Sequence, residues 1–261
     1  MTNPSIKRCV VAGAAKPGIG EAITRLLAGD GYEVHGTYEA DQTKLAASMM
    51  RELPNLRMYE VDHALRSSLA DFLRALPAAP CDALVYAMMH FDMEDPDAFD
   101  HDAWDRSLAV NLTAPNYLIH ELKPRLRDGA SIVTVTSTEA FIGSFGASSY
   151  GSTKAAIHNL MKTHANNLGH RGIRVNVVAP GWIGGVMDTD EVFNLSRRIT
   201  PLGRLGEPAE VAQVIRFLLS PQSSFVNGTV ITVDGGYTGV DTIAQYEFQE
   251  FTKAKRPNKA A

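Results

Sequence analysis

The stretch Arg8-Cys-Val-Val-Ala12, followed at once by Gly13-Ala-Ala-Lys16-Pro-Gly18-Ile19-Gly20, decides the fold. Its first five residues predict a short buried strand, and from Ile19 onward apolar residues recur at helical spacing. Glycines let the backbone pass close to a pyrophosphate, and the N-terminus of a helix offers unpaired N–H groups to the negative charge. A glycine turn alone is often only a turn, but between a strand and a helix it predicts nucleotide binding.

Strand and helix patterns alternate along the rest of the chain. Helices of ten or more residues between strands predict a parallel sheet covered on both faces, and right-handed crossovers make it doubly wound. We therefore expect one α/β domain of the Rossmann type over residues 1–261, with residues 240–261 as a tail of solvated charges and a frayed end. The predicted strands are Glu33–Tyr38, Leu56–Val61, Ala83–Met89, Ile132–Thr136, Arg174–Ala179 and Thr229–Val233, and the predicted helices are Gln42–Glu52, Ser67–Leu76, Ala98–Lys123, Ala147–Leu168 and Pro208–Leu219.

Composition favours a soluble protein that acts on small molecules. The formal net charge of −4 gives no basic field for nucleic acid, and no run of eighteen apolar residues could span a membrane. Two cysteines, Cys9 and Cys81, are too few for a disulfide framework or a metal-ligand cluster, so we expect buried, inert thiols and no metal. The first eight residues lack the apolar core of a signal peptide, which predicts a cytoplasmic location.

A second stretch, from Ser137 to Lys154, predicts the chemistry. Tyr150 and Lys154 are four residues apart, so on one helix they face the same side. Such pairs also occur by chance on solvated helix surfaces, but an ammonium close to a phenol would lower the pKa of the phenol. Ser137 closes a β-branched strand, so its hydroxyl is expected at the carboxyl end of the sheet, facing the helix.

Together with Asn111, these residues resemble the short-chain dehydrogenase/reductase family, and within it the β-ketoacyl-carrier-protein-reductase-like members. The resemblance runs from Arg8 to Tyr237 and implies hydride transfer between a nicotinamide cofactor and a carbonyl or secondary alcohol. It implies that Tyr150 exchanges the proton, Lys154 lowers its pKa and holds the ribose, Ser137 binds the carbonyl oxygen and Asn111 maintains a proton relay. Its most specific segments are Tyr150-Gly-Ser-Thr-Lys154-Ala-Ala, Arg174-Val-Asn-Val-Val-Ala-Pro-Gly181, Pro201-Leu-Gly-Arg-Leu-Gly-Glu-Pro208 and Val233-Asp-Gly-Gly-Tyr237.

The resemblance also implies which residues meet the cofactor, NAD or NADP. The carboxylate of Glu39, after the second strand, favours NAD, whereas Lys16 could pair a 2′-phosphate, and we expect NAD. Asp62 would bind the adenine amino group or else cap the following turn. The glycine turn carries one residue more than the family usually has between its first two glycines. The expected cofactor residues are Gly13, Lys16, Gly18, Ile19, Gly20, Tyr38, Glu39, Asp62, Ala87, Tyr150, Lys154, Pro180 and Ile183.

The largest departure from the family is Tyr86-Ala87-Met88-Met89, where relatives usually have Asn-Asn-Ala-Gly. The two methionines must point away from the cofactor, reshape the pocket or weaken binding, and core packing is an equally good interpretation. If they line the crevice, the substrate should be largely hydrophobic. The residues expected to contribute are Met88, Met89, His90, Phe141, Phe145, Trp182 and Met187.

The same sequence patterns leave two other functions open and also predict an oligomer. The fold could serve an epimerase or dehydratase step, or a non-catalytic protein that senses a nucleotide. The catalytic spacing of Tyr150 and Lys154 argues against a sensor. The apolar faces of helices Ala98–Lys123 and Ala147–Leu168 exceed what one sheet face covers, and relatives pair these helices, so we expect a homotetramer.

Overall fold

The centre of the protein is a seven-stranded parallel sheet. The computed structural model describes residues 6–185 and 189–255. Its sheet order is β3-β2-β1-β4-β5-β6-β7, so the order reverses between β1 and β4 and confirms the predicted doubly wound topology. Ligands of such sheets lie at this reversal, beyond the carboxyl ends of the strands. The strands are β1 (Arg8–Ala12), β2 (Glu33–Tyr38), β3 (Leu56–Glu60), β4 (Cys81–Tyr86), β5 (Leu126–Val135), β6 (Arg174–Pro180) and β7 (Val230–Val233).

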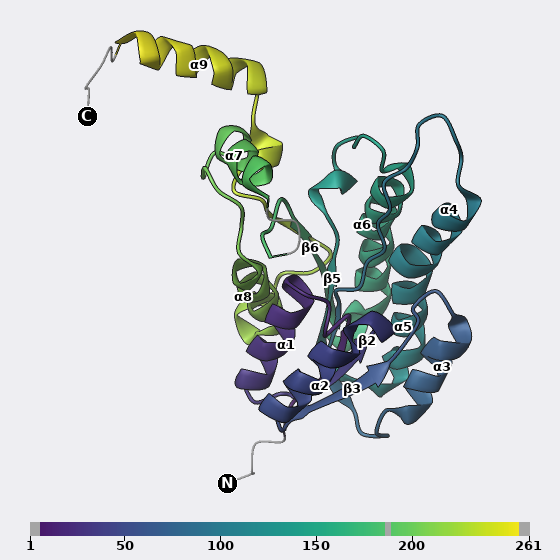
Figure 1. The fold of residues 1–261 in the computed structure, drawn as a ribbon. Helices are drawn as coiled ribbons and strands as arrows, with labels where there is room; N and C mark the ends of the chain where they lie inside the picture. Colours follow the sequence, from purple (N-terminus) through teal and green to yellow (C-terminus); the bar gives the residue numbers. More distant parts are fainter. Residues whose placement is uncertain (1–5, 186–188, 256–261) are drawn as a thin grey trace.

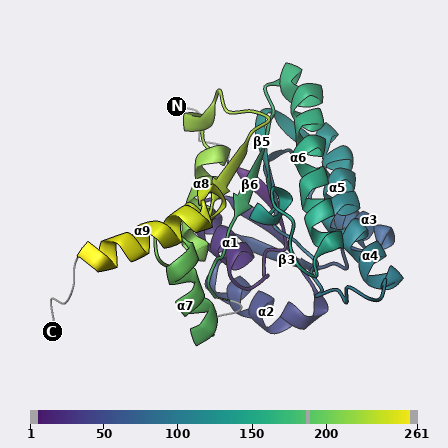
Figure 2. The same ribbon diagram turned by 90° about the horizontal axis from the view of Figure 1, so that it is seen from above.

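Helices cover both faces of the sheet (Figures 1 and 2). Alternate residues of β1 point to opposite faces, so Cys9 and Val11 pack in one core and Val10 and Ala12 in the other. The first core is closed by α1 (Ile19–Gly29), α2 (Thr43–Glu52) and α8 (Pro208–Leu219), and the second by α3 (Arg66–Ala75), α5 (Ala114–Leu122) and α6 (Ser148–Leu168). Within the described ranges, no helix is long and apolar enough to cross a lipid bilayer.

The single helix predicted over Ala98–Lys123 is wrong, because the structure divides it. Asp100 accepts hydrogen bonds from the backbone N–H groups of Asp102 and Ala103, so α4 (His101–Ser107) begins only after this cap. A π-helical segment, Leu108–Thr113, then leads into α5. Pro115 explains the change, since proline has no N–H to donate to the carbonyl four residues earlier, which belongs to Asn111.

Two helices were not predicted. The stretch after Gly185 contains α7 (Asp190–Ile199), which Thr189 caps. The expected tail contains α9 (Thr242–Lys255), because Asp241 accepts hydrogen bonds from the N–H groups of Ile243 and Ala244. Figures 1 and 2 show α9 projecting beyond α7, to which it is joined by a hydrogen bond from Gln245 to the Arg198 carbonyl at 2.9 Å. Four large apolar side chains of this helix are exposed, namely Ile243, Tyr246, Phe248 and Phe251.

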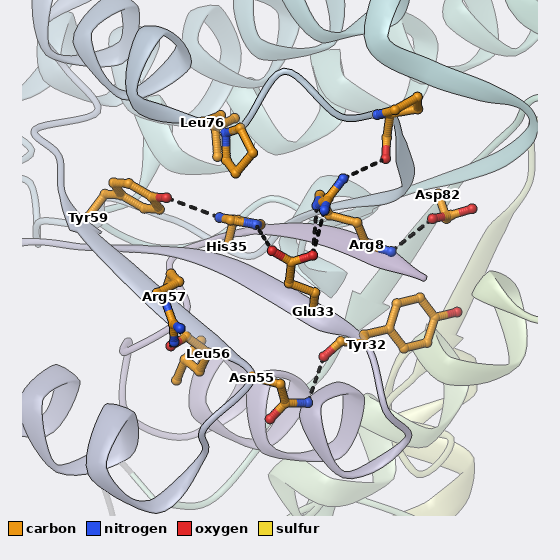
Figure 3. Close-up of polar contacts among 12 residues, drawn as sticks. Arg8, Tyr32, Glu33, His35, Asn55, Leu56, Arg57, Tyr59, Leu76 and Asp82 are labelled. Atoms are coloured by element: carbon orange, nitrogen blue, oxygen red, sulfur yellow. Dashed lines mark hydrogen bonds and ion pairs between the residues drawn. The ribbon is translucent and has the colours of Figure 1, made fainter. Parts of the chain in front are cut away.

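A polar cluster fixes the opposite end of the sheet, where β1 and β2 begin (Figure 3). Arg8 pairs with Glu33 at 2.6 Å, and its backbone N–H donates to Asp82. The two ring nitrogens of His35 lie 3.1 Å from Glu33 and from the hydroxyl of Tyr59. Burial lowers the pKa of His35, so the neutral ring donates to the carboxylate and accepts from the phenol. The cluster therefore joins the first three strands away from the ligand crevice.

Candidate active site

Tyr150, Lys154 and Ser137 come together at the carboxyl end of β5, as predicted. Tyr150 and Lys154 lie one turn apart on α6, and both side chains are buried. The Nζ atom of Lys154 lies 5.3 Å from the centre of the Tyr150 ring and donates to the carbonyl of Val135 at 3.3 Å. The hydroxyl of Ser137 lies close enough to the phenol of Tyr150 to lower its pKa, and both residues line the same cavity. A proton donor and a second hydroxyl thus face the same point.

The structure differs from the expectation that Lys154 lowers the pKa of Tyr150. Burial raises the pKa of the phenol, the charge of Glu139 raises it further, and only the hydrogen bond from Ser137 opposes this. Burial also lowers the pKa of Lys154 to about 7, so the ammonium is a weaker counter-charge than expected. Tyr150 therefore holds its proton at neutral pH, which is the form that can protonate a carbonyl oxygen.

Asn111 lies inside the π-helical segment and fastens it to the chain after β4. Its Oδ1 atom accepts from the N–H of His90 at 2.8 Å, and its amide donates to the His90 carbonyl at 2.9 Å and to Thr153 at 3.2 Å. Pro115 has no N–H to donate to the backbone carbonyl of Asn111, as the residue at that position would in an α-helix. The structure thus places Asn111 beside the catalytic helix, and its part in a proton relay stays a prediction.

The glycine turn is held tightly between β1 and α1. A Cβ atom on Gly20 would lie 2.1 Å from the carbonyl oxygen of Gly13, so the start of α1 touches the turn. Gly13 itself has a φ of +81°, and a Cβ there would lie 2.9 Å from the backbone nitrogen of Met88. The longer spacing is accommodated because Ala14 and Ala15 are buried under the turn. Gly18, which precedes the helix, provides no side-chain cap, so the first N–H groups can meet a phosphate.

A buried polar network supports this turn and accounts for Tyr86. The N–H of Gly13 donates to Thr37 at 2.9 Å, and Thr37 lies 2.8 Å from Nε2 of His63. The phenol of Tyr86 donates to the Val110 carbonyl at 2.6 Å and lies 3.4 Å from Nδ1 of His63. Burial lowers the pKa of His63 to about 4, so the ring is neutral. Thr37 therefore donates to Nε2, and Nδ1–H points to the phenol.

The structure shows where the two methionines that follow Tyr86 and Ala87 lie. Ala87 lines the cavity beside the glycine turn, and its N–H donates to the carbonyl of Ala12 at 2.9 Å. Met88 is 1% exposed and packs in the core, as the core interpretation expects. Met89 lines this cavity and also a second cavity, which adjoins the first at Ser137 and Tyr150. Only the second methionine therefore reshapes the crevice.

A cavity of about 260 Å³ runs from the glycine turn to the catalytic side chains. Backbone N–H groups at one end suit a pyrophosphate, and the other end places a proton donor where a nicotinamide would transfer hydride. These residues fit a nicotinamide dinucleotide, which would supply the hydride. The lining includes nine of the expected cofactor residues, namely Lys16, Gly18, Ile19, Gly20, Ala87, Tyr150, Lys154, Pro180 and Ile183.

Glu39 lies after β2, as predicted, but its side chain already interacts with other residues of the protein. Its side chain forms a reciprocal capping box with Gln42 at the next turn. The carboxylate lies 3.9 Å from Lys16 and 3.5 Å from Arg106, a cation that sequence analysis missed. Burial raises the pKa of Glu39, and these two cations oppose that shift. Tyr38 ends β2 and packs partly buried against the core.

Asp62 lies on the same side of the crevice, after β3. Its Oδ1 atom accepts from the N–H of Ala64 at 2.9 Å, which confirms the turn-capping interpretation. The carboxylate also lies 3.6 Å from Arg106. Its contact with adenine stays a prediction. Across residues 6–185 and 189–255, no three His, Cys, Asp or Glu side chains form a group that could hold a metal ion.

A second cavity, of about 450 Å³, adjoins the first at Ser137, Tyr150 and Trp182. Of the residues expected to face a substrate, Met89, Phe145 and Trp182 line it. Two others do not line it. Phe141 packs on the ring of His158, and the Nε2 atom of His90 lies 2.9 Å from Asp92. Met187, also expected there, lies outside the described residues. Several lining residues were missed by sequence analysis, among them Phe91, Met93, Glu139, Ile142 and Tyr237.

The sequence of this chain is similar to those of named dehydrogenases and reductases. The family profile described as Enoyl-(Acyl carrier protein) reductase matches residues 13–238. The chain is 33% identical over 237 residues to the 3-oxoacyl-(acyl-carrier-protein) reductase FabG of Aggregatibacter actinomycetemcomitans, covering 87% of this chain and 97% of the relative. It is 34% identical over 244 residues to a cis-4-hydroxycyclohexanecarboxylate dehydrogenase of Sinomonas cyclohexanicum, covering 88% and 96%.

Solved structures of NADPH- or NADP-bound proteins also match this chain. A blue fluorescent protein from a metagenomic library, in complex with NADPH, matches with a TM-score of 0.83 and 29% identity over 88% of this chain and 97% of that one. The angucycline C-6 ketoreductase LanV, with bound NADP, matches with a TM-score of 0.82 and 26% identity over 90% and 96%. The chain therefore belongs to the short-chain dehydrogenase/reductase family and is an NAD(P)-dependent oxidoreductase that transfers hydride between nicotinamide and a carbonyl or alcohol.

Proposed function

We propose that the protein is an NADP(H)-dependent reductase of a largely hydrophobic ketone. One observation carries this proposal: the protonated phenol of Tyr150 and the hydroxyl of Ser137 border both the cofactor cavity and a mostly apolar second cavity. A carbonyl oxygen between these two groups would receive a hydrogen bond from each, and its carbon would face the nicotinamide. Met89, Phe145 and Trp182 would contact the rest of the substrate.

The proposal of NADP(H) rests on the charges around Glu39. The sequence favours NAD through this carboxylate, and that preference is not confirmed. Glu39 is held by its capping box, while Lys16 and Arg106 bring two cations to the end of β2. A 2′-phosphate could pair with both cations, whereas the unphosphorylated ribose needs neither. The two solved neighbours described above contain NADPH or NADP.

The test is ketone reduction followed by nicotinamide absorbance, with NADPH and NADH compared. We expect kcat/KM to favour NADPH by about 10-fold or more, and Arg106→Ala or Lys16→Ala to remove most of that preference, because each deletes a charge-assisted bond. Glu39→Ala should retain or increase it. Arg74→Ala, at an exposed ion pair on α3, is the matched control. A preference for NADH in the wild type would refute the NADP(H) proposal alone.

The same assay separates the alternatives. An epimerase or dehydratase would change its substrate without net change in nicotinamide absorbance, because any hydride removed is returned. A nucleotide-sensing protein would bind cofactor and turn over nothing. Absence of hydride transfer to every ketone and from every alcohol, in a protein shown to bind NADPH, would refute the proposed reductase.

We also propose a homotetramer that acts in the cytoplasm. The free, buried thiols Cys9 and Cys81 suit a reducing compartment. An isolated helix of the length of α9 is only marginally stable in water, and its exposed Phe248 and Phe251 would gain from burial against another copy. Light scattering at micromolar concentration should give four times the chain mass of 28.3 kDa. A monomeric mass would contradict the assembly.

A further inference from the structure

Glu139 lies two residues after Ser137, in the short 3₁₀ turn Thr138–Ala140. Its backbone N–H donates to the hydroxyl oxygen of Ser137 at 3.2 Å, so the turn that positions one residue positions the other. Backbone contact with α6 is close as well, because a Cβ on Gly151 would lie 3.4 Å from the Glu139 carbonyl. The carboxylate is therefore held next to the point where the carbonyl oxygen would bind.

One carboxylate oxygen of the half-buried Glu139 has no partner within the described part of the chain. Its Oε2 atom is buried without a hydrogen bond, and among residues 6–185 and 189–255 no cation lies within ion-pair distance of it. Lys154, the cation beside the site, donates to the Val135 carbonyl instead. A buried carboxylate oxygen without a hydrogen-bond donor is unfavourable, so a ligand group that donates to it would stabilise the complex.

The surroundings of Glu139 indicate which kind of group could bind to it. It lines the second cavity together with Ser137 and Tyr150. Most other walls of this cavity are apolar, from Met89, Phe91, Met93, Ile142, Phe145 and Trp182. A purely hydrophobic substrate would fill this space and leave the carboxylate without a donor. A substrate with one hydroxyl in reach of Glu139 would satisfy it, and bringing a hydroxyl into an apolar cavity is far less unfavourable than bringing in a charged group.

We propose that Glu139 is a substrate-binding residue that accepts a hydrogen bond from a hydroxyl of the substrate, and so selects hydroxyketones, and diols in the reverse direction. The inference rests on the proposed function, since it requires a carbonyl bound by Ser137 and Tyr150. It narrows the substrate from any hydrophobic ketone to one that carries a hydroxyl on an otherwise apolar skeleton. Carbonyl compounds without that hydroxyl should react more slowly.

Substitution of Glu139 will also change the acid–base chemistry of the site. Its charge raises the pKa values of Tyr150 and Lys154, so removing it should shift the pH profile toward lower pH for every substrate alike. A ratio of two substrates measured at the same pH is free of this shift. That ratio is therefore the readout.

The experiment uses the full-length protein with saturating NADPH and pairs of cyclohexanones. Each pair carries either a hydroxyl or a methyl group at the same ring position, which is next to the carbonyl, one carbon further, or opposite it. In the wild type we expect kcat/KM to favour the hydroxyl member of at least one pair by about 10-fold to 100-fold, the range for a hydrogen bond to a charged group. Glu139→Leu should bring that ratio within about 3-fold of one, and the isosteric Glu139→Gln should lie between.

Glu121→Gln is the control, because it removes an exposed carboxylate on α5 and should keep the wild-type ratio. If both members of every pair lose activity equally in Glu139→Leu and Glu139→Gln, the inference is overturned while the reductase remains. The same holds if the wild type shows no preference. If the wild type reduces none of these ketones or a wider panel, the proposed function itself has failed. Glu139→Gln preserves shape, so the test stands even if Glu139→Leu does not fold.

Discussion

Replacement of Tyr150 by phenylalanine is expected to give a folded protein that binds NADPH and reduces ketones about 10²-fold to 10⁴-fold more slowly. The substitution removes only the phenolic oxygen, and the aromatic ring keeps its edge contact with Phe91 at a centroid distance of 5.3 Å. The lost oxygen is the proton donor, and its partner Ser137 cannot replace it, because an alcohol is a far weaker acid than a phenol. The effect should therefore fall on kcat more than on cofactor affinity.

Tyr237→Phe is the matched control for this measurement. Tyr237 also lines the second cavity, so the control deletes a phenolic oxygen in the same space without touching the α6 pair. It should change kcat/KM by less than about 10-fold. Single-turnover rates and NADPH titrations of both variants separate chemistry from binding. A Tyr150→Phe enzyme with the rate of the wild type would end the mechanism described above.

The second large effect is expected from Gly20→Ala, at the start of α1. The new Cβ would lie 2.1 Å from the carbonyl oxygen of Gly13 and 3.1 Å from Cβ of Lys16. Because the first contact is backbone, the helix and the glycine turn must separate. Overpacking of this kind typically destabilises a protein by about 1–3 kcal/mol and sometimes more. Moving the helix away from the turn should also weaken NADPH binding by about 10-fold to 100-fold, since about 1.4 kcal/mol corresponds to tenfold.

Gly29→Ala, at the other end of the same helix, tests whether the effect is local. A Cβ at Gly29 meets no atom within 4 Å, so alanine there should be neutral or stabilise the helix by up to about 1 kcal/mol. Urea denaturation and fluorescence titration of NADPH measure the two consequences. Equal stability and equal affinity of the two alanine variants would show that the turn tolerates the displacement.

The fold could be predicted from sequence because local patterns and topology agree. The predicted bounds of β1, β2 and α8 match the structure, and every other predicted strand overlaps an observed one, although β5 begins at Leu126 and not at Ile132. The convergence of Ser137, Tyr150 and Lys154 was also predictable, since parallel strands end at one edge and helical spacing places two side chains together. These inferences need no knowledge of distant contacts.

The errors have particular physical causes. Pro115, four residues after Asn111, was a usable signal for the interrupted helix, and Asp241 was one for α9. Arg106 gave no local signal, because it reaches Glu39 across 67 positions of sequence. Glu139 follows Ser137 by two residues in the sequence, but only the structure shows that its Oε2 atom is buried without a hydrogen bond. The raised pKa of Tyr150 could not be predicted from its spacing to Lys154, because burial of the phenol is the largest cause of the shift.

The buried network of Thr37, His63 and Tyr86 has a consequence for how uniquely the strands pair. The residues of β2 alternate between two buried faces, with Val34, Gly36 and Tyr38 on one and the polar Glu33, His35 and Thr37 on the other, so a slip by one residue would exchange the two sets. Such a slip would turn Thr37 to the other face of the sheet. The N–H of Gly13 and the Nε2 atom of His63 would then lose their partner inside the core, at about 1–3 kcal/mol for each unsatisfied group. The network thus penalises a misaligned β2, so that one pairing of β1 and β2 is selected over its neighbours.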